Sequence, residues 1–457
     1  MPTPHLSKAN RDVSRRAGRD GKCAQGPAPK LNPRSLLAVL LLLTLPLVGC
    51  SGPPTRPQLP AIPFLNPAPE DRKTGRDLHV LLPHEGAVTE ALRSHIHAWA
   101  AERELQVNDS SVADYSRELG DRLQSETPPD LFVVTGFLFP DLAESGLLAP
   151  APDGRLDPAG FPPHLTAAFV WPPDSDDANR YCLPREVRTL ALVYDRVGLA
   201  SAGLTAPTDW ETLRAAAEAQ TNVDLNRFGF IEAPDLSRWL PFFFAAGGTI
   251  IDESGRMVLQ SQAADRAMEW YIRIFRDNFA GHAGESNNEW AGEVLAKGKG
   301  ALTIEGNWIA PYFETHFPAF AYGVAPLPTG PAGSIRTLAF TSCYAVHARS
   351  PFAQEAFDLA ALLSSAELVS ALPNDGGWMP AGNALRDEWR REFPHLAAFA
   401  DGVPGAWVWQ FPPGLGPFLR SFNRGMVQLF AAEIEAGAFL AEMQQMGEQL
   451  LSGPGDQ

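Results

Sequence analysis

The chain has 457 residues, of which 45% are hydrophobic and 20% are charged, and its formal net charge is −16. This length predicts two or three domains, and the apolar share is large enough for substantial cores and excludes wholesale disorder. The acidic balance argues against nucleic acid or anionic lipid as a partner, because both carry negative charge themselves.

The segment 1–49 predicts an export signal that is separate from the fold. A basic stretch precedes the apolar run 36–45, which is shorter than the roughly 20 apolar residues that a membrane-spanning helix needs. The residues that follow, Leu47-Val48-Gly49-Cys50, resemble a bacterial lipobox, which implies that Cys50 is lipidated and begins the mature chain. An ordinary signal peptide that carries a cysteine is the alternative. Cleavage before Cys50 would remove eight Lys and Arg and two Asp, a charge of +6, and leave −22.

The fold is predicted to begin after a proline-rich tether at 50–75. A buried strand at 77–82 leads into the loop Pro83-His84-Glu85-Gly86, and a helix follows. The segments expected next are a helix at 115–124, a strand at 130–134 and a helix at 142–148. This alternation of strands and helices predicts a parallel sheet.

The middle of the chain continues with further strands and helices. A strand at 181–186 is interrupted by Pro184, and the apolar segment 189–194 continues it. Thr208 is expected to cap a helix, because Glu211 three residues later would complete a capping box. The elements expected afterwards are a strand at 228–231, a helix at 240–246 that stops at Gly247-Gly248, and a helix at 263–279.

The stretch 293–328 is the most informative part of the sequence. A short helix around 293–295 precedes a buried strand at 301–304 and the turn Gly306-Asn307-Trp308. Trp308 therefore follows the C-terminal end of a strand, which is the edge where ligands bind in open α/β sheets. The elements expected after it are a helical segment, strands at 320–324 and 338–346, and a helix at 353–364.

The four cysteines have different expected roles. Cys23 lies in the predicted signal, and Cys50 is the candidate lipid anchor. Cys182 and Cys343 lie in apolar, strand-like segments, where the sequence favours buried free thiols. A disulfide is the alternative, because the sequence gives no distance between the two residues. No CxxC pair or histidine cluster predicts a metal site, and no cofactor or catalytic residue is expected.

Several motifs occur in a characteristic order. The most specific are GKGALTIEGNW at 298–308 and YGVAPLP at 322–328. The supporting segments are 130–137, Asp141-Leu142, 181–184, 192–195, 207–210 and 246–248. In this order and spacing the motifs resemble the bacterial extracellular solute-binding proteins of ABC sugar importers, the maltose-binding-protein-like group. The resemblance covers about residues 76–450.

The resemblance implies an α/β fold of the periplasmic-binding-protein type, in which two hinged lobes close on a ligand. The segments expected to cross between the lobes are 183–187, 340–345 and 372–377. The lobes would comprise 76–186 with 343–372 (lobe I) and 187–342 with 373–457 (lobe II). The family further implies a monomer that delivers a sugar or oligosaccharide to an ABC permease. It would face the periplasm or cell exterior, attached to the membrane by its lipid alone.

A sugar ring has apolar C–H faces, so its site needs flat aromatic surfaces. Trp308 is the first candidate, because in the family this turn presents an aromatic platform to the sugar; packing between helices is the alternative. Trp239 and Trp378 are further candidates, with core packing as the alternative. Trp407 and Trp409 would point in opposite directions in an extended segment, so at most one of them is expected to face the ligand.

The rim of hydroxyls on a sugar needs polar partners. Glu186 follows the first crossing segment, where maltodextrin-type members carry a sugar-binding carboxylate, although an ion pair with Arg188 is the alternative. Glu85 lies in the loop after the first strand, at the ligand-binding edge, with a solvated loop as the alternative. Asn307 would bind a hydroxyl or shape its turn.

Two other classes of function remain open. The same fold would bind glycerol phosphate, a polyamine or a peptide if the cleft were suitably charged, and Arg185 and Arg188 leave a phosphate possible. An extracellular glycosidase would need two carboxylates at a defined separation, for which Glu186 and Glu305 are the pair to consider.

Overall fold

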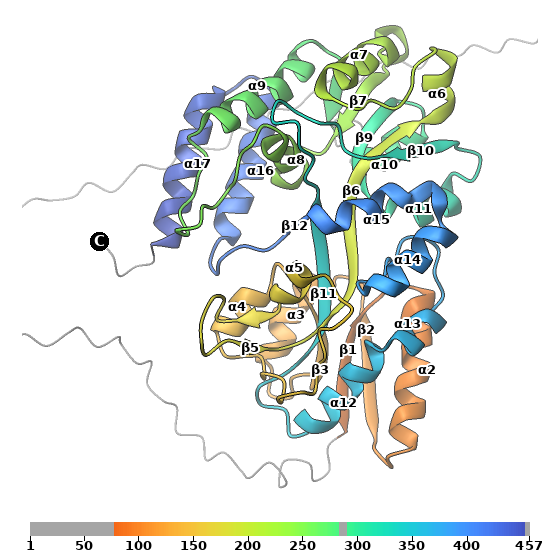
Figure 1. Ribbon diagram of the computed structural model, residues 1–457, viewed down its shortest axis with the longest axis vertical. Helices are drawn as coiled ribbons and strands as arrows, with labels where there is room; N and C mark the ends of the chain where they lie inside the picture. The colour runs from red at the N-terminus through yellow and green to blue at the C-terminus, as the bar shows by residue number, and fades with distance from the viewer. Residues whose placement is uncertain (1–76, 283–289, 453–457) are drawn as a thin grey trace, which may run out of the picture. The chain divides into compact units, whose positions relative to one another are not determined.

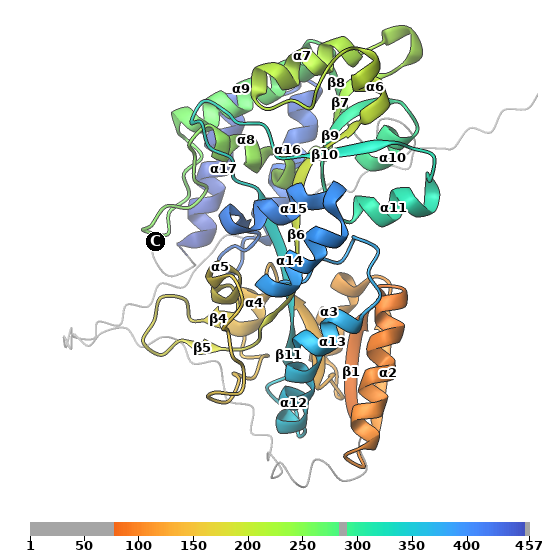
Figure 2. The ribbon, with the colours of Figure 1, turned by 45° about the vertical axis from the view of Figure 1, so that its right-hand side comes forward.

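Two long neighbouring strands connect the two halves of the molecule. The computed structural model describes residues 77–282 and 290–452, which belong to one compact unit, Asn66–Gln457. Strand β6 (Pro184–Asp195) runs antiparallel to β11 (Leu338–Val346), and Figures 1 and 2 show both passing from one half of the ribbon to the other. The predicted signal segment, the tether and Cys50 lie outside the described residues.

Lobe I is the half built on β1 (Leu78–Pro83), β2 (Val107–Val112) and β3 (Leu131–Thr135). These strands are parallel in the order β2-β1-β3, and the C-terminal half of β11 adds an antiparallel strand beside β3. The helices of lobe I are α2 (Ala87–Ala101), α3 (Tyr115–Gln124), α4 (Phe139–Glu144), α12 (Ala353–Leu363) and α13 (Ala366–Ala371). Apolar side chains of β1 and β3 contact α2 and α12 on one face and α3 and α4 on the other, so both faces of this sheet are buried.

Lobe II is the half built on β7 (Phe228–Glu232), β8 (Ala280–His282) and β9 (Gly300–Gly306). These strands are parallel, and β9 pairs antiparallel with the C-terminal half of β6, whose other edge pairs with β10 (Tyr322–Ala325). The helices with their main contacts in lobe II are α6 (Arg196–Ser201), α7 (Trp210–Gln220), α8 (Leu236–Ala245), α9 (Gln262–Arg276), α10 (Ala291–Ala296), α11 (Ile309–His316), α16 (Gly416–Phe430) and α17 (Ala436–Leu451).

Shorter elements lie beside the crossing strands. Helices α14 (Asn383–Glu392) and α15 (Ala397–Gly402) lie next to β6 in Figure 2, and α15 contacts it. Strand β12 (Trp407–Val408) pairs with the N-terminal end of β11. The remaining elements are α5 (Pro163–Ala167), the two-stranded pair of β4 (Val170–Trp171) and β5 (Asn179–Arg180), and 3-10 turns at Val223–Leu225, Pro394–Leu396 and Val403–Gly405.

The predicted α/β class and two-lobed architecture are confirmed, with corrections to individual elements. The sheet is mixed rather than wholly parallel, because β6 and β11 run antiparallel to each other. Strand β2 was not predicted, since its sequence Val-Asn-Asp-Ser-Ser-Val is mostly polar. The predicted break at Pro184 is instead the first residue of β6, a position where the missing N–H of proline costs little.

Two helix ends also differ from the prediction. The capping box of α7 is formed by Asp209 and Thr212, not by Thr208 and Glu211. The side chain of Asp209 accepts from the backbone N–H of Thr212 at 2.8 Å, so the helix begins one residue later than predicted. Helix α9 ends before Asn278, which has a φ of 60°, a left-handed conformation that asparagine tolerates at a helix end.

The expectation of free thiols at Cys182 and Cys343 is wrong. The two residues form a disulfide with a Cα–Cα separation of 5.8 Å. In the ladder between the crossing strands, Cys343 pairs with Pro184, which brings the nearby Cys182 within reach. The disulfide is buried in the core of lobe I and joins the segment that enters β6 to β11.

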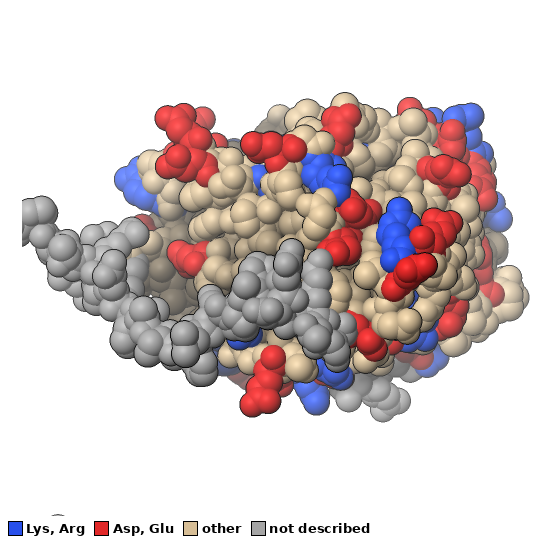
Figure 3. All heavy atoms as spheres, turned by 90° about the horizontal axis from the view of Figure 1, so that it is seen from below, with Lys and Arg blue, Asp and Glu red and all other residues tan. Residues whose placement is uncertain are grey.

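The outer surface is mixed in charge. In the face shown in Figure 3, acidic side chains are interspersed with basic ones. No helix in the described ranges is both long enough and apolar enough to cross a bilayer.

Candidate ligand-binding site

A cavity of about 350 Å³ lies where β1 and β3 end against the crossing strands. Parallel strands place their following loops at one edge of the sheet, which is where open α/β sheets bind ligands. Its lining residues are Pro83, Glu85, Tyr115, Ser116, Val133, Thr135, Phe137, Glu186, Arg188, Phe340, Thr341, Ser342 and Trp409. The cavity therefore combines residues of lobe I with residues of both crossing strands and of the segment after β12.

The polar side of the cavity is a chain of alternating charges. Glu85 accepts from Arg185 Nη2, and its other oxygen accepts from Arg188 Nη2 at 3.1 Å. Arg188 Nε lies 3.2 Å from Glu186 Oε2, and Ser342 Oγ donates to Glu186 Oε1 at 2.7 Å. We call Glu85, Arg185, Glu186 and Arg188 the charged quartet.

Mutual attraction keeps Glu85 and Arg185 ionised despite their burial. Burial alone would raise the pKa of Glu85, but Arg185 and Arg188 outweigh it and hold that pKa below its ordinary value. The Arg185 side chain is only 1% exposed and lies over the rings of Tyr344 at 5.2 Å and Trp378 at 5.8 Å. Burial lowers its pKa, and Glu85 more than reverses this effect.

The quartet sums to zero charge, with two carboxylates and two guanidinium groups. A charged solute therefore gains little electrostatic attraction from the quartet as a whole. A neutral solute with hydroxyl groups gains hydrogen bonds there. Glu186 Oε2 is buried and has no hydrogen bond, because its approach to Arg188 Nε lacks hydrogen-bonding geometry. Glu186 lines the cavity, and a carboxylate oxygen without a hydrogen-bond donor suits a ligand hydroxyl.

Another part of the cavity lining is aromatic, and its Phe340 is the register partner of Arg188 on the neighbouring crossing strand. The rings of Phe340 and Trp409 lie 5.6 Å apart, and Phe137 completes this wall. Trp308 meets Phe340 edge-on at 5.8 Å and donates from Nε1 to Glu305 Oε2 at 3.0 Å. Trp308 thus extends the aromatic wall beyond the lining residues.

Other predicted ligand residues lie away from the lining. Trp239 is fully buried and stacks on Phe243 at 4.8 Å within the core of lobe II. Trp378 packs in the core of lobe I beneath Arg185. These positions correspond to the core-packing alternatives for both residues.

Asn307 and Trp407 support the neighbourhood of the cavity instead of lining it. Asn307 is fully buried; its side chain accepts from Thr189 N at 3.3 Å and donates to Gly377 O at 3.0 Å. Trp407 packs against Phe244 at 5.9 Å, so Trp409 is the one of the Trp407–Trp409 pair that lines the cavity.

Comparison with known proteins gives the family. The description "Bacterial extracellular solute-binding protein" matches residues 88–368, which is more than half of the chain. The chain belongs to this family. A binding protein of Brucella abortus is 21% identical over 339 residues, which are 72% of this chain and 81% of the relative.

Solved structures of similar fold come from several bacteria. An ABC substrate-binding protein of Listeria monocytogenes in complex with cycloalternan has a TM-score of 0.71 at 18% identity, covering 81% of this chain and 97% of that one. The GacH receptor of Streptomyces glaucescens, solved unliganded and with acarbose, has a TM-score of 0.70 at 21% identity, covering 83% and 99%. The cyclic alpha-maltosyl-1,6-maltose binding protein of Arthrobacter globiformis has a TM-score of 0.68 at 19% identity, covering 82% and 99%.

Several lining residues of this solute-binding protein were not singled out from its sequence. Thr135 is the last residue of β3 and Phe137 follows it, whereas Phe340 and Ser342 lie on β11. The sequence signal for Thr135 and Phe137 is the predicted end of a strand. For Phe340 and Ser342 it is the predicted second crossing segment. Which side chain of an extended crossing strand faces the cavity depends on its register with β6, which the sequence does not give.

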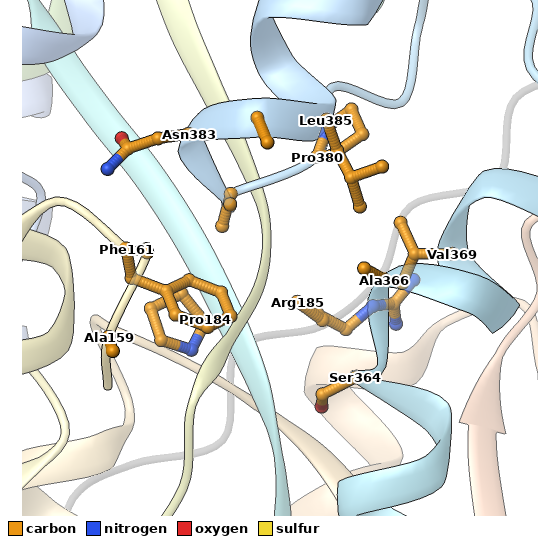
Figure 4. Close-up of a pocket in the computed structure, with 14 residues that line it drawn as sticks. Ala159, Phe161, Pro184, Arg185, Ser364, Ala366, Val369, Pro380, Asn383 and Leu385 are labelled. Carbon is orange, nitrogen blue, oxygen red and sulfur yellow. The ribbon is translucent and has the colours of Figure 1, made fainter. Parts of the chain in front are cut away.

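A second pocket of about 260 Å³ lies around the first residues of β6. Figure 4 shows Phe161, Pro184, Asn383 and Leu385 around it, with Arg185 as its charged residue. Arg185 Nη2 bonds to Glu85, whereas its Nε and Nη1 are buried without a hydrogen-bond partner. Across residues 77–282 and 290–452, no group of three or more His, Cys, Asp or Glu is arranged to hold a metal.

Proposed function

We propose that this solute-binding protein captures a sugar or oligosaccharide and delivers it to the permease of an ABC importer. The observation that carries the proposal is the cavity itself, whose lining combines an aromatic wall of Phe137, Phe340 and Trp409 with Glu85, Glu186 and Arg188 of the charge-neutral quartet. A pyranose offers apolar faces to such a wall and hydroxyls to such a floor. The solved relatives with acarbose, cycloalternan and maltotetraose are consistent with this class of ligand.

The two sides of the cavity would select for different features of the ligand. Glu186 Oε2 would accept a ligand hydroxyl, and Arg188, whose side chain is 31% exposed, would donate to another. Trp409 and Phe340 would contact a ring face, with Trp308 placed to meet a further ring. Because the quartet is internally paired, glycerol phosphate and polyamines would each have to disrupt an existing ion pair.

Binding, not turnover, would be the whole reaction. The lobes would be 76–186 with 343–372 and 187–342 with 373–457, and a ligand contacting both would shift the population toward a closed form. Glu305 pairs with Ala191, five residues along β6 from Glu186, is buried and bonds to Arg238 at 2.8 Å, which disfavours the two as the carboxylate pair of a glycosidase. We further propose that the protein is a monomer, that its mature chain is lipidated at Cys50, and that it faces the periplasm or cell exterior.

Tryptophan fluorescence tests the proposal. The chain from Ser51 to Gln457 would be titrated with maltose, maltotetraose, acarbose, glycerol-3-phosphate and spermidine. We expect a saturable change with a sugar, which Trp409→Ala abolishes and Trp290→Ala, a control outside the lining, retains. A response to glycerol-3-phosphate or spermidine alone would keep the fold and overturn the sugar assignment. Sustained hydrolysis of a nitrophenyl glycoside would overturn the receptor function.

A further inference from the structure

The segment 409–414, which we call the latch segment, is attached to lobe II at both of its ends. It continues β12, and its first residue Trp409 donates its backbone N–H to Ala339 O at 2.8 Å. Within and just after it, Phe411 is 3% exposed and Leu415 is 1% exposed, and both pack in the core of lobe II. In Figure 1 the chain passes from β12 to the start of α16 along this route.

Two residues of the latch segment, Gln410 and Gly414, bond to lobe I. Gln410 uses both hydrogens of Nε2, which donates to Gly136 O at 3.1 Å and to Ala168 O at 2.7 Å. Gly414 N donates to Asp141 Oδ1 at 2.8 Å. The three acceptors come from the loop after β3, the end of α5 and helix α4, so the contact spans separate elements of lobe I.

The two attachments differ in strength. Buried aromatic and aliphatic side chains such as Phe411 and Leu415 hold the segment to lobe II through a large apolar area. The contacts with lobe I are three hydrogen bonds and the edge-on contact of Phe411 with Phe137, whose ring centroids lie 6.4 Å apart. Each hydrogen bond contributes little, because water competes for the same groups. When the lobes separate, the bonds of Gln410 and Gly414 should therefore break first, and Trp409 should leave Thr135 and Phe137 together with lobe II.

We propose that the latch segment holds the two lobes in their present arrangement and carries Trp409 of the aromatic wall with it. Gln410 is its positioning residue, since its side chain satisfies two backbone carbonyls of lobe I at once. Trp409, the adjacent residue, faces the cavity. When the lobes separate, Trp409 therefore moves away from Phe137 of the aromatic wall. This holds for any solute that the cavity binds.

The test measures lobe separation without any ligand. The chain from Ser51 onward would carry Glu102→Cys in lobe I and Val223→Cys in lobe II, both exposed, with nitroxide labels. The native disulfide is buried and should not be labelled. Pulsed electron paramagnetic resonance would compare the unmodified latch with Gln410→Ala, Asp141→Ala and the control Gln428→Ala, an exposed glutamine on α16.

We expect one dominant distance for the unmodified latch and for the control. Gln410→Ala should add a second, longer distance between the two labels, with the ratio of separated to joined lobes rising about tenfold. Asp141→Ala should add the same longer distance in a smaller fraction of molecules. Thermal melting by circular dichroism would verify folding, and Asp141, being exposed, gives a second variant that tolerates truncation. Identical distances in all four proteins, or a separated form already dominant with the latch intact, would overturn the proposal. Because no sugar is present, these results are independent of the proposed function.

Discussion

Glu85 is the residue whose removal tests the charged quartet most severely. It is the common partner of Arg185 and Arg188. Replacing it by glutamine keeps the shape and removes the charge. Arg185, with a side chain 1% exposed, would then be a buried cation without its direct counter-ion.

The magnitude follows from that burial. Breaking a buried ion pair by removing one partner costs about 3–5 kcal/mol, because the remaining charge is uncompensated. Glu85 itself is 20% exposed, and Glu186 still attracts Arg185, so we expect a value near the lower end, about 3 kcal/mol. Exposed Glu388 on α14 is the matched control, and Glu388→Gln should change the free energy of unfolding by less than about 0.5 kcal/mol.

Urea denaturation at several pH values is the assay. The pKa of Glu85 is lowered in the folded protein from an ordinary value of 4.5, so its contribution to stability is fully present above about pH 4.5. It is lost as the pH falls further, through the folded pKa. The difference between the unmodified protein and Glu85→Gln should therefore be constant from pH 7 to about pH 5 and shrink below pH 4.5. The ion-pair role of Glu85 would be wrong if Glu85→Gln were as stable as Glu388→Gln. It would also be wrong if the stability difference between the unmodified protein and Glu85→Gln stayed the same below pH 4.5.

Three further predictions concern the aromatic wall, the disulfide and the core. Trp409→Ala should weaken binding of the sugar found by fluorescence about tenfold or more in calorimetry, since it removes a ligand surface. Joint replacement of Cys182 and Cys343 by serine should lower the free energy of unfolding by about 2–5 kcal/mol in urea titrations; an unchanged midpoint would contradict a disulfide. Trp239→Ala should cost about 3–5 kcal/mol, because it leaves a cavity beside Phe243, whereas loss of sugar binding with full stability would instead place Trp239 in the site.

The order and type of most elements could be predicted from the sequence. Strands such as β1, β3 and β11 are buried on both faces, so their continuous apolar runs are recognisable. Strand β2 escaped prediction because it is a polar edge strand whose identity depends on pairing with β1. The disulfide escaped because the approach of Cys182 to Cys343 is created by the crossing of β6 and β11, far apart in sequence.

The candidate site was predictable to a lesser degree. Glu85 and Glu186 were found from their places after a strand and at a crossing, and both line the cavity. Residue type alone did not separate Trp409 in the wall from Trp239 in the core, because tryptophan suits both environments. The partnership of Glu85 with Arg185 depends on the crossing strand reaching the loop after β1, which no local pattern encodes.

The location of a bound sugar is the most direct test of the proposal that the cavity binds a sugar. Crystals of the chain from Ser51 onward, grown with the sugar that gives the largest fluorescence change, would show where that sugar lies. We expect a sugar ring against Trp409 and Phe340, with hydroxyls within hydrogen-bonding distance of Glu186 Oε2 and of Arg188. A sugar bound elsewhere, such as in the pocket beside Pro184, with the cavity between the quartet and the aromatic wall containing only water, would contradict it.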